Sequence, residues 1–480
     1  MALKFNCFVI GFTGLDSLDL HHPIYNFSNT IKLKIMRRYF TKEVSFHERD
    51  ATAYIKKTAY PLQSKADLQP LFDSIGDARI VMLGEASHGT HEYYTWRTHI
   101  TKRLIEEKGF NFIAVEGDWP DCYRLNRFVK GYDIADKGAL KVLQAFRRWP
   151  TWMWANWEIT ALADWLQLHN QGLPANKKAG FYGLDVYSLW ESMESIMDYL
   201  KKTDRAALRI AENAYRCFEP YSKDEGRSYA SASQFVPDLC QADVVALLKE
   251  IRQKMPSYNT DHENVFNAEQ NALVAVEAEK YYRAMIKGGP HSWNIRDRHM
   301  ADTLDRLLNF HGENSKAIVW EHNTHIGDAR ATDMAEEGMF NIGELARLEH
   351  HEKGVFLVGF GSYKGSVMAG RSWGAAMQSI QMPEAAKGSW EYLLHQAGAE
   401  NKLLLMDDFT GNDMFMENHL GHRAVGVVYN PQYEQYGNYV PTILPLRYNA
   451  FIFLDETTAL HPLHIEPDGH QVPETYPFGV

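Results

Sequence analysis

Carboxylate and imidazole side chains follow directly on several short apolar runs of this chain. The side chains in question are Glu85, His88, Glu116, Asp118, Asp185, His322 and His325. An imidazole titrates near neutrality, so a histidine among them can take a proton from water. A carboxylate hydrogen-bonded to its other ring nitrogen would fix the tautomer and favour the imidazolium. The combination indicates acid–base chemistry, although each residue alone is as typical of a helix cap or a surface group.

Buried strands are the elements that would bring these groups together. Residues 80–83 and 112–115 are apolar runs separated by a helical pattern over 91–108, and this order predicts a βαβ unit with parallel strands. Further apolar runs predict strands at 181–184, 317–320, 355–358, 403–406, 424–429 and 450–454. Ligands of open parallel sheets bind beyond the carboxyl ends of the strands, so we expect one converging site.

A long helical region predicts the domain organisation. Between 189 and 315 the pattern is almost wholly helical, with clear helices at 262–287 and 294–310. We therefore expect an α/β fold with a mostly parallel central sheet flanked by helices and a large helical insertion over about 189–315. Residues 41–480 are predicted to form the catalytic domain, and residues 1–40 a weakly ordered extension, with Met36 as an alternative start.

Arg97 is the most informative single residue. Helical spacing places it on one face of the 91–108 helix with Tyr93, Ile100 and Leu104, and that face must pack on the sheet. A buried guanidinium needs a carboxylate, because an unpaired buried charge costs several kcal/mol. We expect Glu85 or Glu116 as the partner, in a catalytic or in a purely structural ion pair.

Five ordered motifs carry a resemblance to a known family: GEASHGTHEYYTWR, AVEGDWPD, FRRWPTWMW, WNIRDRHMADTL and EHNTHIGD. Together with RAVGVVYNP and AFIFLDETTALHPL, they make the chain similar to the erythromycin esterase family from about residue 45 to near its C-terminus, in the branch of uncharacterised bacterial homologues. The resemblance implies an α/β core with a helical part and a deep cleft. There a histidine activates water to open a macrolide lactone, an activity connected with antibiotic resistance.

The resemblance also implies roles for particular residues. His88 is the base of the GExxHG motif, and Glu85, Arg97, Glu116, His322 and His325 match the other catalytic positions. Glu85 or Glu116 would orient His88, and His322 or His325 would bind the oxyanion or protonate the leaving group. Trp152, Trp154, Asp118 and Asn323 are predicted to contact the substrate, with core packing as the alternative for the tryptophans.

Other chemistries stay open. Gly370 to Gly374 match GxSxG around Ser372, and Asp407 and His422 follow in the order of a serine hydrolase, but residues 367–369 are too short to predict a strand before the serine. The glutamates and histidines could instead hold a metal, which the expected burial of Arg97 opposes, so we expect no metal and no cofactor. A non-catalytic accessory protein with the same cleft is a third alternative.

Composition limits the partners and the location. The 480 residues carry 50 Lys and Arg against 61 Asp and Glu, a net charge of −11, so we expect no attraction to nucleic acid or to an anionic membrane surface. Four scattered cysteines predict neither a disulfide scaffold nor a zinc module, and they favour the reducing cytoplasm. The expected partner is a small-molecule ester or lactone.

Overall fold

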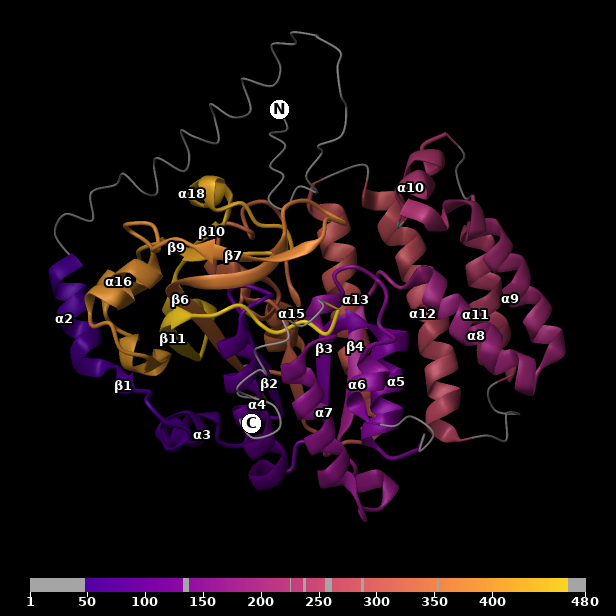
Figure 1. The fold of residues 1–480 in the computed structure, drawn as a ribbon, viewed down its shortest axis with the longest axis horizontal. Coiled ribbons are helices and arrows are strands. Elements are labelled where there is room, and N and C mark those ends of the chain that lie inside the picture. Colours follow the sequence, from indigo (N-terminus) through magenta and orange to yellow (C-terminus); the bar gives the residue numbers. More distant parts are fainter. Residues whose placement is uncertain are drawn as a thin grey trace, which may run out of the picture. The chain divides into compact units, whose positions relative to one another are not determined.

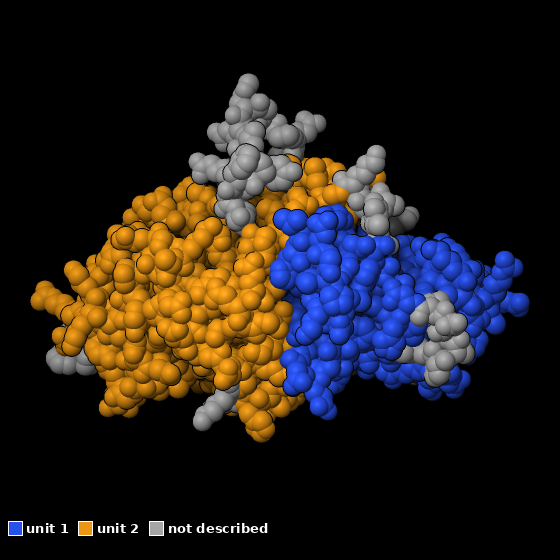
Figure 2. Space-filling view, turned by 90° about the horizontal axis from the view of Figure 1, so that it is seen from below, with its two compact units in different colours: residues 1–6, 111–137, 166–315 blue, residues 7–110, 138–165, 316–480 orange. Residues whose placement is uncertain are grey.

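The computed structural model describes residues 48–132, 138–224, 226–235, 239–254, 261–285, 289–351 and 354–464 (Figure 1). The predicted extension at 1–40 lies outside the described residues. The described parts of 111–137 and 166–315 form one compact unit, called unit 1, and those of 48–110, 138–165 and 316–464 form another, called unit 2 (Figure 2).

Unit 2 is built on a mostly parallel sheet. Its strands run in the order β1-β8-β11-β6-β2-β5, and β7 pairs with β6 off this path. The β11–β6, β6–β2 and β2–β5 pairs are parallel, whereas β1–β8, β8–β11 and β6–β7 are antiparallel. The strands are β1 (Tyr60–Pro61), β2 (Ile80–Leu83), β5 (Ala317–Trp320), β6 (Val355–Gly370), β7 (Met377–Met382), β8 (Lys402–Leu405) and β11 (Ala450–Thr457). The predicted α/β fold class is confirmed.

The centre of this sheet is apolar because both of its faces are covered. Every residue of β2 and of β5 is buried, as expected for parallel strands with no solvent-facing side. Strand β6 continues far beyond the predicted 355–358, because its second half pairs with β7 from Gly365 to Gly370. The expectation that residues 367–369 are too short for a strand was therefore wrong.

Helices and short turns complete unit 2. The α4 helix (His91–Lys108) has the predicted bounds and ends at Gly109, whose positive φ of 69° suits glycine. The other helices named here are α2 (Glu48–Thr58), α3 (Gln69–Ile75), α6 (Ala139–Leu143), α7 (Trp157–Asn170, whose last residues belong to unit 1), α14 (Asn323–Ile326), α15 (Ile342–Glu349), α16 (Trp390–Gln396), α17 (Asp413–Met416), α18 (Glu434–Gly437) and α19 (Leu444–Arg447).

Unit 1 joins two parallel strands to a set of helices. Strands β3 (Phe112–Asp118) and β4 (Gly180–Asp185) pair in parallel. The helices are α5 (Trp119–Val129), α8 (Leu189–Thr203), α9 (Arg205–Phe218), α10 (Arg227–Ser233), α11 (Gln241–Lys254), α12 (His262–Met285) and α13 (Pro290–His311). Helices α8, α9, α11 and α12 pack their apolar faces into one core that also includes residues of α10.

Cysteine chemistry differs from the prediction. Cys217, near the end of α9, and Cys240, just before α11, form a disulfide with their Cα atoms 5.8 Å apart. Chain spacing could not show this pair, because helix packing brings the two residues together. A disulfide is typical of oxidising compartments and therefore argues against the predicted cytoplasmic location, which stays a prediction. Within the described part of the chain, every helix is too short or too polar to cross a membrane.

Two strand predictions were wrong in detail. The partners of β2 are β5 and β6, so the strand at 112–115 is not its neighbour as the βαβ interpretation assumed. Residues 424–429 form only isolated bridges, at Val425 and Val428, instead of a strand. The strand in this region is β9 (Leu420–Arg423), which pairs antiparallel with β10 (Tyr439–Thr442).

Candidate functional site

A histidine, a glutamate and an arginine of unit 2 form a continuous hydrogen-bonded group. Glu85 Oε1 lies 3.0 Å from His88 Nδ1, and Glu85 Oε2 accepts a 2.6 Å bond from Arg97 Nη2. All three side chains are buried. One carboxylate thus holds the imidazole with one oxygen and the guanidinium with the other, so the position and tautomer of His88 depend on Glu85.

The loop that carries Glu85 and His88 needs its two glycines. A Cβ atom at Gly84 would collide with the Asn323 side chain, and one at Gly89 would collide with the Met368 backbone. With glycine at both positions the main chains come close enough to form hydrogen bonds. The Met368 N–H donates to the Gly89 carbonyl at 2.9 Å, and the Asn323 N–H donates to the Glu85 carbonyl at 2.8 Å. The loop after β2 is therefore fixed against both β6 and the turn after β5.

Arg97 lies on the buried face of α4, as the helical spacing predicts. Its guanidinium carbon is 4.5 Å from the Tyr94 ring centroid and 4.6 Å from the Trp320 ring centroid. Its Nε and Nη1 have no hydrogen-bond partner. Stacking between aromatic faces and the pairing with Glu85 together balance the desolvation of this charge.

The HNTH sequence after β5 lies beside this group. The rings of His88 and His322 are 4.9 Å apart between centroids, and His325 is also buried. His322 Nδ1 accepts from the Thr324 backbone at 3.2 Å and lies 2.8 Å from its hydroxyl, which fixes the ring as the cap of α14. Asn323 donates to the Phe360 carbonyl at 2.6 Å and accepts from its N–H at 3.3 Å, which fastens α14 to β6.

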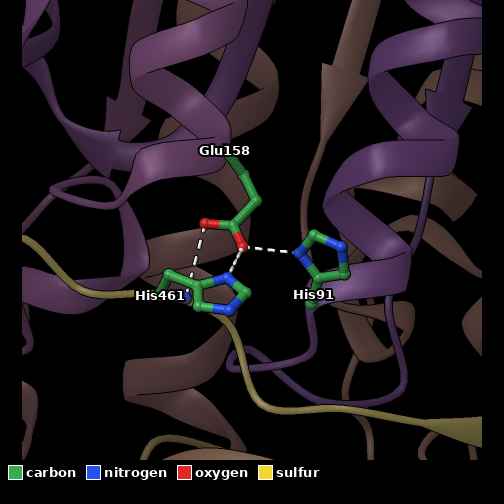
Figure 3. Close-up of side chains that lie close together, drawn as sticks. All are labelled: His91, Glu158 and His461. Carbon is green, nitrogen blue, oxygen red and sulfur yellow. Dashed lines mark hydrogen bonds and ion pairs between the residues drawn. The ribbon is translucent and has the colours of Figure 1, made fainter. Parts of the chain in front are cut away.

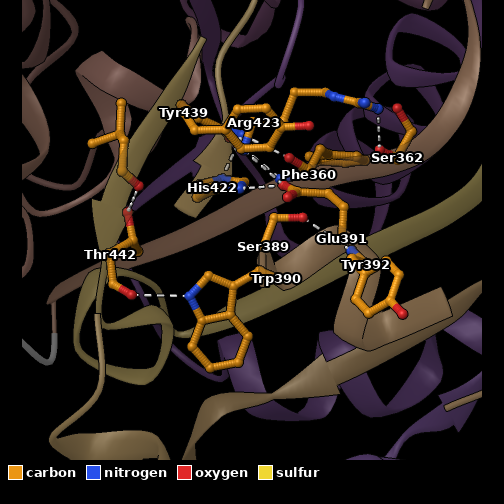
Figure 4. A network of polar contacts seen from close by, with 12 residues as sticks. Phe360, Ser362, Ser389, Trp390, Glu391, Tyr392, His422, Arg423, Tyr439 and Thr442 are labelled. Carbon is orange, nitrogen blue, oxygen red and sulfur yellow. Dashed lines mark hydrogen bonds and ion pairs between the residues drawn. The ribbon is translucent and has the colours of Figure 1, made fainter. Parts of the chain in front are cut away.

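A second buried histidine–glutamate pair was not predicted from the sequence. His422 Nδ1 lies 2.5 Å from Glu391 Oε1 (Figure 4). His422 Nε2 is 3.2 Å from both Asn323 Nδ2 and Tyr448 Oη. Burial lowers the pKa of His422, against the opposing attraction of Glu391. Neither residue follows a predicted strand in an obvious motif, so only the fold could reveal the pair. Its contact with Asn323 indicates that it supports the HNTH turn.

The contacts of His422 also bear on the serine-hydrolase alternative. Both ring nitrogens of His422 contact Glu391, Asn323 and Tyr448 rather than Ser372 or Asp407. Asp407 is exposed at the turn after β8. A serine nucleophile needs a histidine whose ring nitrogen reaches its hydroxyl, so the geometry gives no support to Ser372 as a nucleophile.

The predicted residues at the ends of β3 and β4 belong to unit 1. Arg296 Nη2 bonds Glu116 at 2.6 Å and Asp185 at 2.7 Å, and its Nε bonds Asp185 at 2.9 Å. Burial alone would lower the pKa of Arg296, but Asp185 and the other neighbours raise it well above its usual value. Asp118 ends β3 and occupies the N-cap position of α5. Glu116 therefore has its own arginine, and Arg97 pairs with Glu85, the first of its two predicted partners.

The predicted tryptophans are buried. Trp152 is fully buried with its indole N–H unpaired, and Trp154 packs its ring 6.2 Å from that of Tyr94. Trp154 therefore adjoins the aromatic residue that stacks on Arg97. This placement fits core packing, and contact with a substrate stays a prediction for both residues.

Comparison with known proteins gives concordant results. Erythromycin esterase type II of Escherichia coli is 23% identical over 373 residues, covering 72% of this chain and 85% of that protein. A succinoglycan biosynthesis protein of known structure superposes with a TM-score of 0.69 at 19% identity, covering 86% of this chain and 98% of the other. The open conformation of an erythromycin esterase mutant superposes with a TM-score of 0.62 at 16% identity, covering 83% and 97%. At these identities the structures establish a shared fold.

The family profile described as erythromycin esterase matches residues 105–457. That range includes Glu116, His322 and His325, whereas Glu85, His88 and Arg97 lie before it. Because the match covers well over half of the chain, the protein belongs to the erythromycin esterase family.

Proposed function

We propose that this protein hydrolyses a carboxylic ester or a macrolide lactone by water that His88 activates. The observation that carries the proposal is the single carboxylate of Glu85, which is shared between His88 Nδ1 and Arg97. Membership of a family of esterases supports the reaction class. The name of the Escherichia coli relative supports a lactone, which is an internal ester, as a substrate.

The proposed chemistry begins with the tautomer of His88. With Nδ1–H donated to Glu85, the ring carries its lone pair on Nε2, so Nε2 takes a proton from water as the water oxygen attacks the carbonyl carbon. Glu85 stabilises the imidazolium that forms. Collapse of the tetrahedral intermediate breaks the bond to the alkoxide, which receives the proton, and the acid is released.

The other predicted residues have supporting roles in this proposal. His322 or His325 binds the oxyanion or protonates the alkoxide, and the neighbouring ring of His322 supports this assignment. Arg97 holds the Glu85 carboxylate in place through its 2.6 Å bond to Oε2. Asn323, whose amide is bonded at both ends to Phe360, acts by positioning the HNTH turn. Glu116 remains a candidate for a second carboxylate, and Asp118, Trp152 and Trp154 for substrate contacts.

The test compares wild-type protein with His88→Ala on a panel of p-nitrophenyl esters and a 14-membered macrolide lactone. We expect the variant to lose about 10²- to 10⁴-fold in kcat/KM, the usual contribution of a positioned general base. Ser372→Ala is the matched control, and it should keep most of the activity. A folded His88→Ala variant with wild-type turnover would contradict the proposal, as would labelling of Ser372 by a serine-reactive phosphonate with loss of activity.

A further inference from the structure

Two histidines and a glutamate from distant parts of unit 2 meet outside the proposed catalytic group. His91 Nδ1 lies 2.6 Å and His461 Nδ1 2.7 Å from the same oxygen, Glu158 Oε1 (Figure 3). The two imidazole rings are 5.2 Å apart and nearly perpendicular. One ligand atom from each of the three residues lies within 4.8 Å of the other two, and within the described residues no other group of three or more such side chains does so.

The main chain holds this group in place. His91 is the first residue of α4 and Glu158 the second residue of α7, and His461 lies on the segment that follows β11. That segment bonds to both helix starts, because His91 donates to the Thr458 carbonyl at 2.9 Å and Trp157 donates to the His461 carbonyl at 3.0 Å. Side chains on rigid, cross-linked elements are a requirement for a preformed site.

We propose that His91, Glu158 and His461 form a binding site for a divalent transition-metal ion such as Zn²⁺. Two imidazoles with one carboxylate are ligands typical of zinc and related metals, and three protein ligands leave a coordination position for water or a ligand. The proposal is independent of the hydrolytic mechanism, which uses His88 and Glu85.

The burial of the three side chains gives the site a closed base and an open side. The Glu158 side chain is only 1% exposed, whereas the His91 side chain is 17% exposed and the His461 side chain 39% exposed. An ion can therefore reach the histidines from solvent and meet a buried negative charge behind them. Burial by itself would raise the pKa of Glu158, but the hydrogen bonds from His461 and His91 outweigh it and lower the pKa.

The site needs only a small adjustment to accept a metal. Two ligands on one tetrahedral zinc lie about 3.3–3.6 Å apart, given metal–ligand distances of roughly 2.0–2.2 Å. The present N–O separations of 2.6 and 2.7 Å must open by about 0.6–1 Å. Binding through Nδ1 also requires each imidazole to give up any proton that Nδ1 donates to Glu158, either to Nε2 of the same ring or to solvent.

The experiment titrates the EDTA-treated, desalted full chain with Zn²⁺ by calorimetry and with Co²⁺ by visible absorption. We expect one equivalent to bind to the wild type, with the ligand-field bands of a nitrogen–oxygen site. His461→Ala and Glu158→Gln should bind at least about 10- to 100-fold more weakly, since even loss of an outer partner of a metal ligand has that effect. His461 is part-exposed, so its variant should fold, and the melting temperature without metal checks this.

His395→Ala is the matched control. His395 Nδ1 lies 2.6 Å from Asp455 in a part-buried pair without a second histidine. This variant should bind Zn²⁺ as the wild type does, and added Zn²⁺ should raise its melting temperature equally. Zinc binding that is absent from the wild type, or equal in wild type and His461→Ala, would overturn the proposal and would leave the function of His88 unaffected.

Discussion

Arg97 joins catalysis to folding at the level of a single side chain. It is fully buried, makes one hydrogen bond to Glu85 and is stacked between Tyr94 and Trp320. Arg97→Ala should lower the free energy of unfolding by about 3–5 kcal/mol, because it leaves Glu85 as an uncompensated buried charge. Arg97→Lys restores the charge but neither the planar stacking nor the aim of the N–H group, so it should recover stability better than turnover.

Urea denaturation and steady-state kinetics on both variants check this prediction. Wild-type stability and rate in Arg97→Ala would contradict it. A lysine variant that recovers rate as fully as stability would show that only the charge of Arg97 matters.

The buried His299 predicts how the stability of the protein changes in acid. It is buried on α13 in unit 1 with no partner for Nε2, and burial lowers its pKa from 6.5 to about 4. The unfolded chain takes up a proton near pH 6.5 and the folded chain does not, so this group makes stability fall as the pH drops through that window. The loss by pH 4.5 is about 2 kcal/mol from the one side chain.

Urea midpoints at pH 7 and 4.5 measure this effect. His299→Met, which fills the site without titrating, should show a smaller loss of stability in acid than the wild type. The exposed His291 offers the control, and His291→Met should keep the wild-type pH profile. Equal acid sensitivity in wild type and His299→Met would exclude a role for this histidine.

At the level of elements, the Asn323 amide is one of the groups that hold the short α14 helix, beside Asn341 and Arg447. Asn323 bonds Phe360 on β6 and contacts His422, and its backbone N–H donates to Glu85. Asn323→Ala leaves buried groups of Phe360 unpaired, which should cost about 1–3 kcal/mol, and it should also reduce turnover because the HNTH turn loosens.

Asn170 gives a matched comparison for this amide. It makes an equivalent set of bonds in unit 1, to the Val129 carbonyl and to both backbone groups of Ala179. Asn170→Ala should lose similar stability and keep kcat in assays below its melting range. If both variants lose turnover in proportion to their stability, Asn323 is a general structural residue.

The elements that the sequence predicts best are those with a local pattern. The apolar runs before Glu85 and His322 are true strands, and the helical face that buries Arg97 is real, because period and burial can be read within one segment. The run at 424–429 is apolar yet forms no strand: its Val425 and Tyr429 pack in one core with residues of β6 and β7, and β9 makes the strand pairing instead. Strand neighbours were mispredicted because they depend on the whole sheet.

The side-chain groups that the sequence did not predict are those built from long-range contacts. Glu391 and His422 come together across 31 residues, and Glu158 and His461 across 303. No local period connects such pairs. For the His91, Glu158 and His461 group, the sequence gives one local signal. His91, in the GTHE sequence, follows the predicted base His88 by three residues.

For the molecule as a whole, the Cys217–Cys240 disulfide predicts that the stability of unit 1 can be lowered without a change in hydrolysis. It closes a loop with a sequence separation of 23, for which the chain-entropy model gives about 3 kcal/mol. Cys217→Ser should therefore destabilise the helical core of unit 1. Hydrolysis should remain unchanged below the melting range, because none of the candidate site residues lies on α9 or between Cys217 and Cys240.

Denaturation with and without dithiothreitol checks this prediction. Reductant should shift the wild type toward the behaviour of Cys217→Ser and should have no further effect on that variant. If dithiothreitol leaves the denaturation midpoint of the wild type unchanged, the two cysteines do not form the bond in solution.

The position of β2 in its sheet has a consequence for synthesis of the chain. Its two partners, β5 and β6, begin at residues 317 and 355, whereas β2 begins at residue 80. At roughly 5–20 residues per second, a ribosome needs about 12–50 seconds to make the segment between β2 and β5. During that interval a wholly apolar strand has emerged without either partner, and the helices from α8 to α13 are made before it can pair. Nascent chains of this protein should therefore need a holding chaperone until the second half of the sheet is complete.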